Sequence, residues 1–448
     1  MAQPRFGTDG IRGLAFEELS TEIAMCLGRA TARVMDLERV VVGRDTRESG
    51  PALSTALIEG LNSEGVQVLD VGVLPTPGVA FLSASMMMPG FVLSASHNPF
   101  HDNGIKVIGS GGTKLSTATE VAIEKELEAL LLDPSQHVYA GTKGTTAQEP
   151  GTHRLYTDSL VNVLGVDALA SMSIVVDCAN GAAFETAKVV LEALGAKVTT
   201  IGAEPNGRNI NDGVGSTHPE KLSSTVVAQG ADLGLALDGD ADRLIAVDAN
   251  GAVIDGDALL ALFAKDLKDQ GRLANDTVVV TVMTNLGFHR AMEHEQINVQ
   301  TVAVGDRNVV EAIDKDKLTL GGEQSGHIIF REFATTGDGL LSGLLLADLL
   351  RRSSSTLGEL AASAFTLYPQ YLEAVPVAPG SDLAGATELW ERVKSAELDL
   401  GDRGRILIRA SGTEPVIRVM VEAEDDAHAR QLTAELVALV AKSLGSQG

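Results

Sequence analysis

The sequence is poor in several residue types, and each shortage narrows the function. Only two of its 448 residues are cysteines, Cys26 and Cys178, which excludes a disulfide framework and fits a reducing compartment. Aromatic residues make up 4% of the chain, too few for a surface that stacks on nucleic-acid bases. The formal net charge of −25 argues against nucleic acid or an anionic membrane as the main partner. A local cluster of Arg and Lys could still bind an anionic substrate.

Long apolar runs are also missing. The densest one, residues 340–350, is interrupted by Ser342, Gly343 and Asp348, so it predicts a buried helix rather than a membrane span. The first residues contain no apolar core of signal-peptide length. We therefore expect a cytoplasmic protein that acts on a small molecule, with no nucleic acid and no membrane as partner.

A pattern of strand, polar loop, helix and strand occurs three times, starting near Val40, Ile174 and Val278. Such units build parallel sheets covered by helices. The last segment differs, because two short strands flank a turn at Ser411 and an amphipathic helix follows over residues 427–444. We predict an α/β protein with three similar mixed α/β domains in series plus a smaller C-terminal α+β domain, with boundaries at 1–150, 151–250, 251–370 and 371–448.

The first candidate site is the polar stretch from residue 94 to residue 106. The apolar residues 90–93 predict a buried strand that leads into it. The stretch then offers two hydroxyl groups, an imidazole and an ammonium group, from Ser94, Ser96, His97 and Lys106. A serine is a weak nucleophile unless a base or a cation lies nearby. Taken alone, the stretch is more typical of a polar turn that ends a strand.

The second candidate site is an acidic loop between two apolar segments. Asp238, Asp240 and Asp242 alternate along it, and three carboxylates this close repel one another unless a cation lies between them. Hard oxygen ligands select Mg²⁺ or Ca²⁺. An EF-hand would need Gly and Glu where Arg243 and Ala249 stand, so we predict Mg²⁺ beside a phosphate. The alternative is a solvated acidic turn.

Two further loops carry polar groups next to glycine. Glu323, Ser325 and His327 supply an acid, a hydroxyl and an imidazole that could bind a sugar or move a proton, although a plain polar turn is equally consistent. Near the C-terminus, a tight turn combines arginines and hydroxyls in a pattern typical of anion binding, the alternative being a charged hairpin tip. Its residues are Arg409, Ser411, Gly412, Thr413 and Arg418.

Together these motifs are far more specific than any one of them. The chain resembles the α-D-phosphohexomutase superfamily over essentially its whole length, through residues 8–12, 94–99, 238–243, 322–327 and 409–415. The resemblance implies that the four domains surround a central active-site cleft and that each domain contributes one motif to it.

The resemblance also implies a role for each site residue. Ser96 would carry a phosphoryl group and, with the three aspartates, hold one Mg²⁺. Arg12 and Lys106 would add positive charge, Lys106 or His327 would act as general base, and His97 would orient the serine loop. Substrate would be bound by Arg243, Glu323, Ser325, Arg409, Ser411, Gly412, Thr413 and Arg418.

Gln324, together with Ser411 and Gly412, is similar to the branch of the superfamily that acts on glucosamine phosphates. The implied reaction interconverts glucosamine 6-phosphate and glucosamine 1-phosphate through a 1,6-bisphosphate and supplies UDP-N-acetylglucosamine synthesis. Two alternative functions stay open: a glucose or mannose phosphate mutase, and a non-catalytic sugar-phosphate sensor. A homodimer is a separate possibility that the sequence leaves open. Asn308, where the resemblance predicts an aromatic residue, and Val214, where relatives often have Cys, are small departures.

Overall fold

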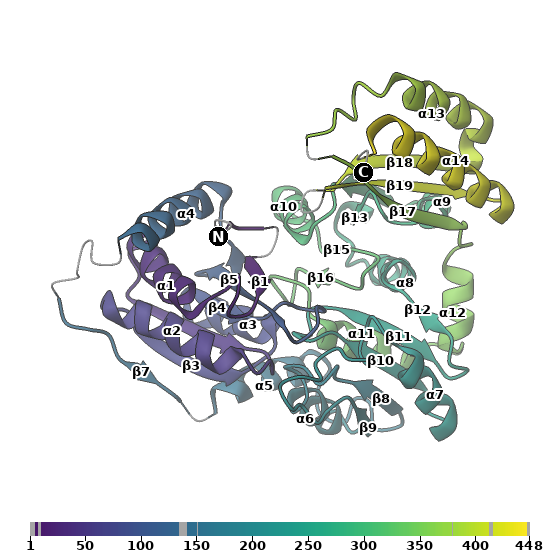
Figure 1. The fold of residues 1–448 in the computed structure, drawn as a ribbon. Coiled ribbons are helices and arrows are strands. Elements are labelled where there is room, and N and C mark those ends of the chain that lie inside the picture. The colour runs from purple at the N-terminus through teal and green to yellow at the C-terminus, as the bar shows by residue number, and fades with distance from the viewer. Residues whose placement is uncertain are drawn as a thin grey trace. The chain divides into compact units, whose positions relative to one another are not determined.

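The structure is a computed structural model that describes residues 5–7, 10–133, 141–149, 151–378, 380–411 and 415–445. These residues form two compact units, which are described separately (Figure 1). The larger unit comprises the described residues up to Met283 together with Ile297–Ala362. The smaller unit comprises Thr284–Gln296 and the described part of the chain from Ser363 onward.

The larger unit begins with a mixed seven-stranded sheet. Four strands form its centre, in the order β5, β4, β2 and β3, with β4, β2 and β3 parallel and β5 antiparallel to β4. Helices α1, α2 and α4 enclose an apolar core with this sheet. The elements are β1 (Ile11–Leu14), α1 (Thr21–Met35), β2 (Arg39–Arg44), α2 (Gly50–Ser63), β3 (Gln67–Val73), α3 (Thr76–Met86), β4 (Gly90–Leu93), β5 (Asp102–Gly109), β6 (Thr113–Lys114), α4 (Thr117–Leu132) and β7 (Thr146–Ala147).

A second sheet of the larger unit has five strands in the order β12, β11, β10, β8, β9. Strands β10, β8 and β9 are parallel, whereas β11 returns antiparallel to β10, so a short loop joins the end of β10 to the start of β11. The elements are α5 (Thr152–Leu164), β8 (Ser173–Asp177), α6 (Thr186–Ala193), β9 (Lys197–Ile201), α7 (Glu220–Gln229), β10 (Leu233–Leu237), β11 (Leu244–Asp248) and β12 (Val253–Ile254).

A third sheet, in the order β14, β13, β15, β16, completes the larger unit. Helix α10 packs its buried residues against this sheet, and α11 is the buried helix predicted over residues 340–350. The elements are α8 (Gly256–Asp269), β13 (Thr277–Thr281), β14 (Asn298–Val302), α10 (Asp306–Asp316), β15 (Leu320–Gly322), β16 (Ile328–Phe330) and α11 (Gly339–Arg352), with α12 (Leu357–Ala364) following.

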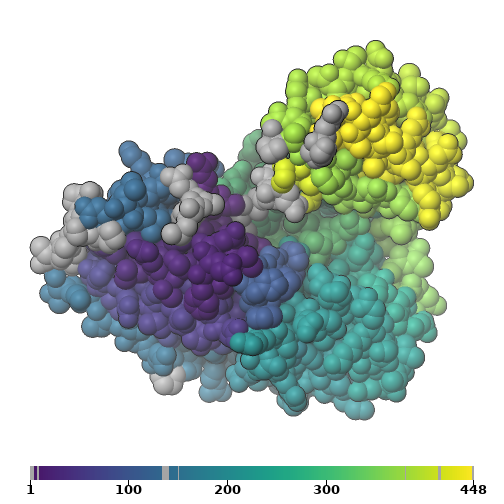
Figure 2. Space-filling view, viewed as in Figure 1, coloured from purple at the N-terminus to yellow at the C-terminus, as the bar shows by residue number. Residues whose placement is uncertain are grey.

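The smaller unit is an antiparallel three-stranded sheet with helices packed on it. Helices α13 and α14 lie side by side over the sheet (Figures 1 and 2) and bury Leu389, Val419 and Leu436. Helix α9, although it lies between β13 and β14 in the sequence, belongs to this unit. The elements are α9 (Leu286–His294), β17 (Gln370–Pro376), α13 (Thr387–Leu400), β18 (Gly404–Ala410), β19 (Val416–Ala423) and α14 (Asp426–Leu444).

The expected class, three mixed α/β domains followed by a smaller α+β domain, is confirmed. The irregular loop predicted over residues 94–106 was too long, because strand β5 begins at Asp102 and includes Lys106. The exact domain boundaries stay predictions, as does the central cleft. Among the described residues, no helix combines the length and apolar character needed to span a membrane.

Candidate active site

Ser96 lies in the connection between the antiparallel strands β4 and β5. Its side chain and backbone are almost completely buried, and its φ of 51° lies in the left-handed region that residues with a side chain seldom adopt. Ser94, also buried, accepts a hydrogen bond from the Ser96 N–H through Oγ at 3.0 Å. Such a backbone conformation costs on the order of 1–3 kcal/mol and persists only where surrounding contacts impose it.

Arg47 imposes much of that conformation. Its guanidinium is fully buried and pairs with Asp45, with Nε 2.8 Å from Oδ2. It also donates to the backbone carbonyls of Ser96 at 3.0 Å and Asn98 at 2.8 Å, and to two further carbonyls of the connection. Asn211 donates to the same two carbonyls, at 2.9 and 3.1 Å. The sequence patterns identified none of these three side chains as part of the site.

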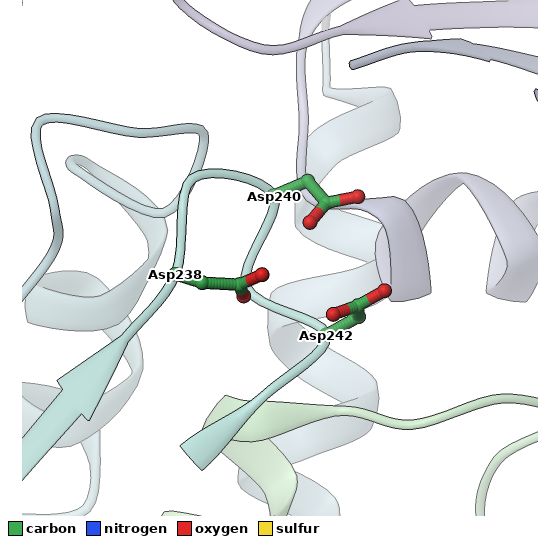
Figure 3. A group of neighbouring side chains, drawn as sticks. All are labelled: Asp238, Asp240 and Asp242. Carbon is green, nitrogen blue, oxygen red and sulfur yellow. The ribbon is translucent and has the colours of Figure 1, made fainter. Parts of the chain in front are cut away.

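The acidic loop connects β10 to β11 and brings its three aspartates together (Figure 3). One carboxylate oxygen from each of Asp238, Asp240 and Asp242 lies within 4.8 Å of the others, and all three residues are buried. The carboxylates converge on one point because Ala241, between two of them, takes a left-handed φ of 57° that turns the chain back. The predicted grouping is therefore observed in the structure.

The aspartates also meet the predicted serine and lysine. Ser96 Oγ donates to Asp238 Oδ2 at 2.6 Å, and Lys106 Nζ lies 2.8 Å from Asp240 Oδ2 and 3.5 Å from Asp242 Oδ2. Thr76, at the start of α3, donates its hydroxyl to the same oxygen of Asp240 at 2.6 Å. The β4–β5 hairpin, α3 and the acidic loop thus meet at one point in the larger unit.

The carboxylate oxygens of this cluster that accept no hydrogen bond indicate a cation site. Oδ1 of Asp240 and Oδ1 of Asp242 are buried and accept no hydrogen bond from the described residues. Burial, together with the charges of its two neighbours, raises the pKa of Asp238 well above its usual range. Burial would also raise the pKa of Asp242, but Lys106 and His327 outweigh it and hold that pKa below its usual range. Oxygen ligands in this arrangement fit Mg²⁺.

His327 approaches the acidic loop from the third sheet. Its Nδ1 lies 3.7 Å from Asp242 Oδ2, and its Nε2 accepts a hydrogen bond from the Gly337 N–H at 3.1 Å. Burial disfavours a second ring proton, but Asp242 outweighs burial and raises the pKa of His327 to about 9. The Gly337 N–H would have to move aside to admit that proton. Both ring nitrogens are thus occupied within the protein.

The loop that carries Glu323 and Ser325 packs tightly against the second sheet. Gly326 makes this possible, because its φ of 90° suits glycine and a Cβ there would lie 2.1 Å from the Leu244 carbonyl oxygen. Glu323 is half-buried and accepts a hydrogen bond from the Gly305 N–H at 3.0 Å, while Ser325 is exposed. The loop thus presents one anchored carboxylate and one accessible hydroxyl.

The other predicted cationic groups of the larger unit surround His97. Nδ1 of His97 lies 3.4 Å from Ser96 Oγ. Burial, and then the guanidinium charges of Arg243 and Arg12, lower the pKa of His97 to about 4, so the ring is neutral near pH 7. The backbone N–H of Arg243 also donates to Asp238 Oδ1 at 3.2 Å. Positive charge from Arg243 and Arg12 thus acts on His97 beside the serine, while the aspartates act on it in the opposite direction.

The predicted anion site lies in the smaller unit. Arg409 on β18 and Arg418 on β19 stand directly opposite each other, and like charges in such a pair destabilise a sheet. Burial and the charge of Arg418 lower the pKa of Arg409, whose Nε is buried and makes no hydrogen bond with the described residues. Ser411 follows β18 and closes the turn by donating its N–H to Val416. The predicted ligands Gly412 and Thr413 lie outside the described residues.

Comparison with known proteins identifies the family. Four sequence models match in order: phosphoglucomutase/phosphomannomutase alpha/beta/alpha domain I over residues 3–132, domain II over 154–251, domain III over 255–368 and the C-terminal domain over 372–439. The chain belongs to the phosphoglucomutase/phosphomannomutase family. All five candidate motifs of this family member lie inside the matched segments.

Relatives of known name are similar over their full length. A phosphoglucosamine mutase of Nocardia farcinica is 48% identical, covering 97% of this chain and 99% of that protein. One of Mycobacterium sp. is 48% identical, covering 99% of both. A crystal structure of a phosphoglucomutase/phosphomannomutase family protein from Burkholderia thailandensis superposes with a TM-score of 0.80 at 25% identity, over 97% of each chain.

Proposed function

We propose that this chain is a phosphosugar mutase that interconverts glucosamine 6-phosphate and glucosamine 1-phosphate, as the names of its relatives indicate, and so supplies UDP-N-acetylglucosamine synthesis. The observation that carries the proposal is the 2.6 Å hydrogen bond from Ser96 Oγ to Asp238, within a cluster of three buried carboxylates and one lysine. A phosphoryl-transfer site needs this combination of a hydroxyl, a cation site and fixed positive charge.

The reaction has two phosphoryl transfers. In the first, the bond between phosphorus and Ser96 Oγ breaks, and a new bond forms to the sugar's 1-hydroxyl, whose proton passes to a base. The resulting 1,6-bisphosphate turns around, and Ser96 Oγ, left without a proton by the first transfer, attacks the phosphorus at position 6. The bond from that phosphorus to the 6-oxygen breaks, and the base returns its proton to the 6-oxygen. Mg²⁺ held by Asp238, Asp240 and Asp242 would offset the negative charge on the transferring group.

We assign the proton transfer to Lys106, which would act as base in its neutral form and regain its positive charge on taking the sugar's proton. His327 directs one nitrogen to Asp242 and the other to a backbone N–H, so neither faces a substrate. Lys106 lies beside Asp240, in the same cluster as the hydroxyl that Ser96 presents to Asp238. The neutral His97, 3.4 Å from Ser96 Oγ, would orient that hydroxyl, and Arg12 would add positive charge near the transferring group.

Each unit carries residues to which we assign a role in substrate binding. Glu323, Ser325 and Arg243 would bind the sugar near the serine. Arg409, Ser411, Gly412, Thr413 and Arg418 would hold the phosphate that is not reacting, which explains why two arginines can stand opposite each other on neighbouring strands. A bound phosphate would compensate both positive charges.

The proposal is tested by turnover of the 6-phosphates of glucosamine, glucose and mannose by one preparation, with phosphopeptide mapping of Ser96. Preference for the glucosamine compound supports it. Preference for glucose or mannose would favour the broader mutase activity for which the family is named. If the protein turned over none of the three, the non-catalytic sugar-phosphate sensor would be the remaining interpretation.

We also propose that the protein is located in the cytoplasm. Cys26 and Cys178 are both buried free thiols, which suits the reducing cytoplasm. The homodimer stays a prediction that sedimentation at several protein concentrations can test.

A further inference from the structure

The first turn of α10, residues 305–307, lies between two parts of the larger unit. One is the sugar loop, residues 322–327, and the other is the N-terminal layer, by which we mean β6 and α4 with the sheet that they accompany. On one side it contacts the loop of residues 322–327: the Gly305 N–H donates to Glu323 Oε1 at 3.0 Å, and Asp306 Oδ2 lies 4.0 Å from His327 Nε2. Any displacement of this turn would therefore be transmitted to the Glu323 carboxylate.

On its other side, the turn is held by two ion pairs from different elements. Lys114 Nζ, on β6, lies 2.6 Å from Asp306 Oδ2. Glu120, on the first turn of α4, pairs with Arg307, which also donates to the Thr117 hydroxyl at 3.2 Å. All four charged side chains are mostly buried, with exposed fractions of 21% for Lys114, 14% for Asp306, 20% for Arg307 and 12% for Glu120.

Apolar packing does not fix this turn in the same way. The buried apolar residues of α10, Val309, Val310 and Ile313, pack with their own sheet. Toward the N-terminal layer there is a small cavity of about 40 Å³, lined by Lys114, Glu120 and Arg307 together with apolar side chains that include Val310. The ion pairs are therefore the specific contacts that we expect to fix where the first turn of α10 stands, since side chains that border a cavity are not close-packed.

We propose that the pairs Lys114–Asp306 and Glu120–Arg307 are positioning contacts that place the Glu323 carboxylate for the sugar. This inference rests on the proposed function. The two pairs do not touch the substrate. They act through the backbone of residues 305–307, by fixing the N–H group that orients Glu323. Removing a pair should weaken the binding of the sugar and leave the phosphoserine site intact.

The test compares Glu120→Gln and Lys114→Met with Glu126→Gln. Glu126 is a matched control, because it lies on the same helix and forms an ion pair with Arg33 at 2.8 Å, but makes no hydrogen bond or ion pair with α10 among the described residues. We expect Glu120→Gln and Lys114→Met to raise KM about tenfold with little change in kcat, as for a lost ground-state contact. Glu126→Gln should resemble the parent protein.

Two further measurements separate positioning from a general loss of structure. Hydrolysis of phospho-Ser96 by water should proceed at the parent rate in both variants, because water does not use Glu323. The exchanged pair Glu120→Arg with Arg307→Glu should restore most of the lost affinity. Equal losses of hydrolysis and mutase turnover, no rise in KM, or no recovery in the exchanged pair would overturn the inference.

The outcome is independent of which sugar the enzyme prefers. Each variant is compared with the parent protein on whichever of the three sugar 6-phosphates the parent turns over best. Failure of the parent protein to turn over any of them overturns the proposed function. In that case, equilibrium binding of glucosamine 6-phosphate takes the place of KM, and unchanged binding in Glu120→Gln and Lys114→Met overturns the positioning role.

Discussion

Replacing Arg47 with methionine should release the serine loop from its most important anchor. Methionine has a similar length and fits an apolar space, so the cavity left behind should be small. The loss is electrostatic: Asp45 keeps a fully buried carboxylate without its partner, and four backbone carbonyls lose a charged donor. Breaking a buried ion pair in this way costs about 3–5 kcal/mol.

The pH dependence of this loss has a definite sign. Burial raises the pKa of Asp45, and Arg47 is the largest opposing influence. In Arg47→Met that opposition disappears, so the pKa of Asp45 in the folded protein rises further above its unfolded value. Folding then favours the protonated acid, and the stability lost should be smallest at low pH and grow as pH rises through the folded pKa.

Urea unfolding at several pH values, followed by hydrogen exchange of amides 94–104, measures both effects. Arg33→Met is the control, because Arg33, on α1, forms ion pairs with Glu64 and Glu126, neither of which belongs to the serine loop. We expect faster exchange of the loop amides only in Arg47→Met, together with reduced phosphorylation of Ser96. Loop amides that exchange at the parent rate in a clearly destabilised Arg47→Met protein would refute the anchoring role.

Three further changes test the site directly. Ser96→Ala should abolish turnover without unfolding the protein, and full activity by the same assay would transfer the nucleophilic role to Ser94. Asp240→Asn should require at least about tenfold more Mg²⁺ for half-maximal rate, since an amide is a weaker ligand for a hard cation than a carboxylate; an unchanged Mg²⁺ dependence would make the loop a simple acidic turn. Arg418→Ala should lower kcat/KM by a factor that corresponds to about 1.5–3 kcal/mol of lost transition-state binding, as for a lost charged contact. The rate of hydrolysis of phospho-Ser96 should stay unchanged. An equal fall in hydrolysis would assign Arg418 to the fold or to the chemistry.

The elements that the sequence predicted are those whose signals are local. Helix α14 covers the predicted residues 427–444 and begins at Asp426, because Asp425 caps it by accepting the His428 N–H at 2.7 Å. The acidic loop was recognised because its three carboxylates are flanked by two fully buried strands, β10 and β11. In both cases the residues that determine the structure lie within a few positions of one another.

Strand β5 was missed because its buried side chains include polar ones. Asn103 is completely buried and donates to the Ser49 hydroxyl at 2.8 Å, and Lys106 is buried against the aspartates. A method that infers burial from apolar periodicity interprets such a segment as a loop. The error falls on the segment that brings Lys106 to the site, and local rules are expected to fail where function requires buried charge.

The groups that accept the hydrogen bonds holding Ser96 in place cannot be recognised from the sequence, because they are backbone carbonyl oxygens. Arg47 binds the carbonyl oxygens of Ser96, Asn98, Pro99 and Asp102, and every residue type offers the same carbonyl. No pattern within the loop can therefore reveal the donor about fifty positions earlier. Substitutions within the loop leave these acceptors in place, whereas a substitution of Arg47 removes a donor from all four carbonyls at once. The serine's strained conformation is consequently more sensitive to Arg47 than to most of its own neighbours.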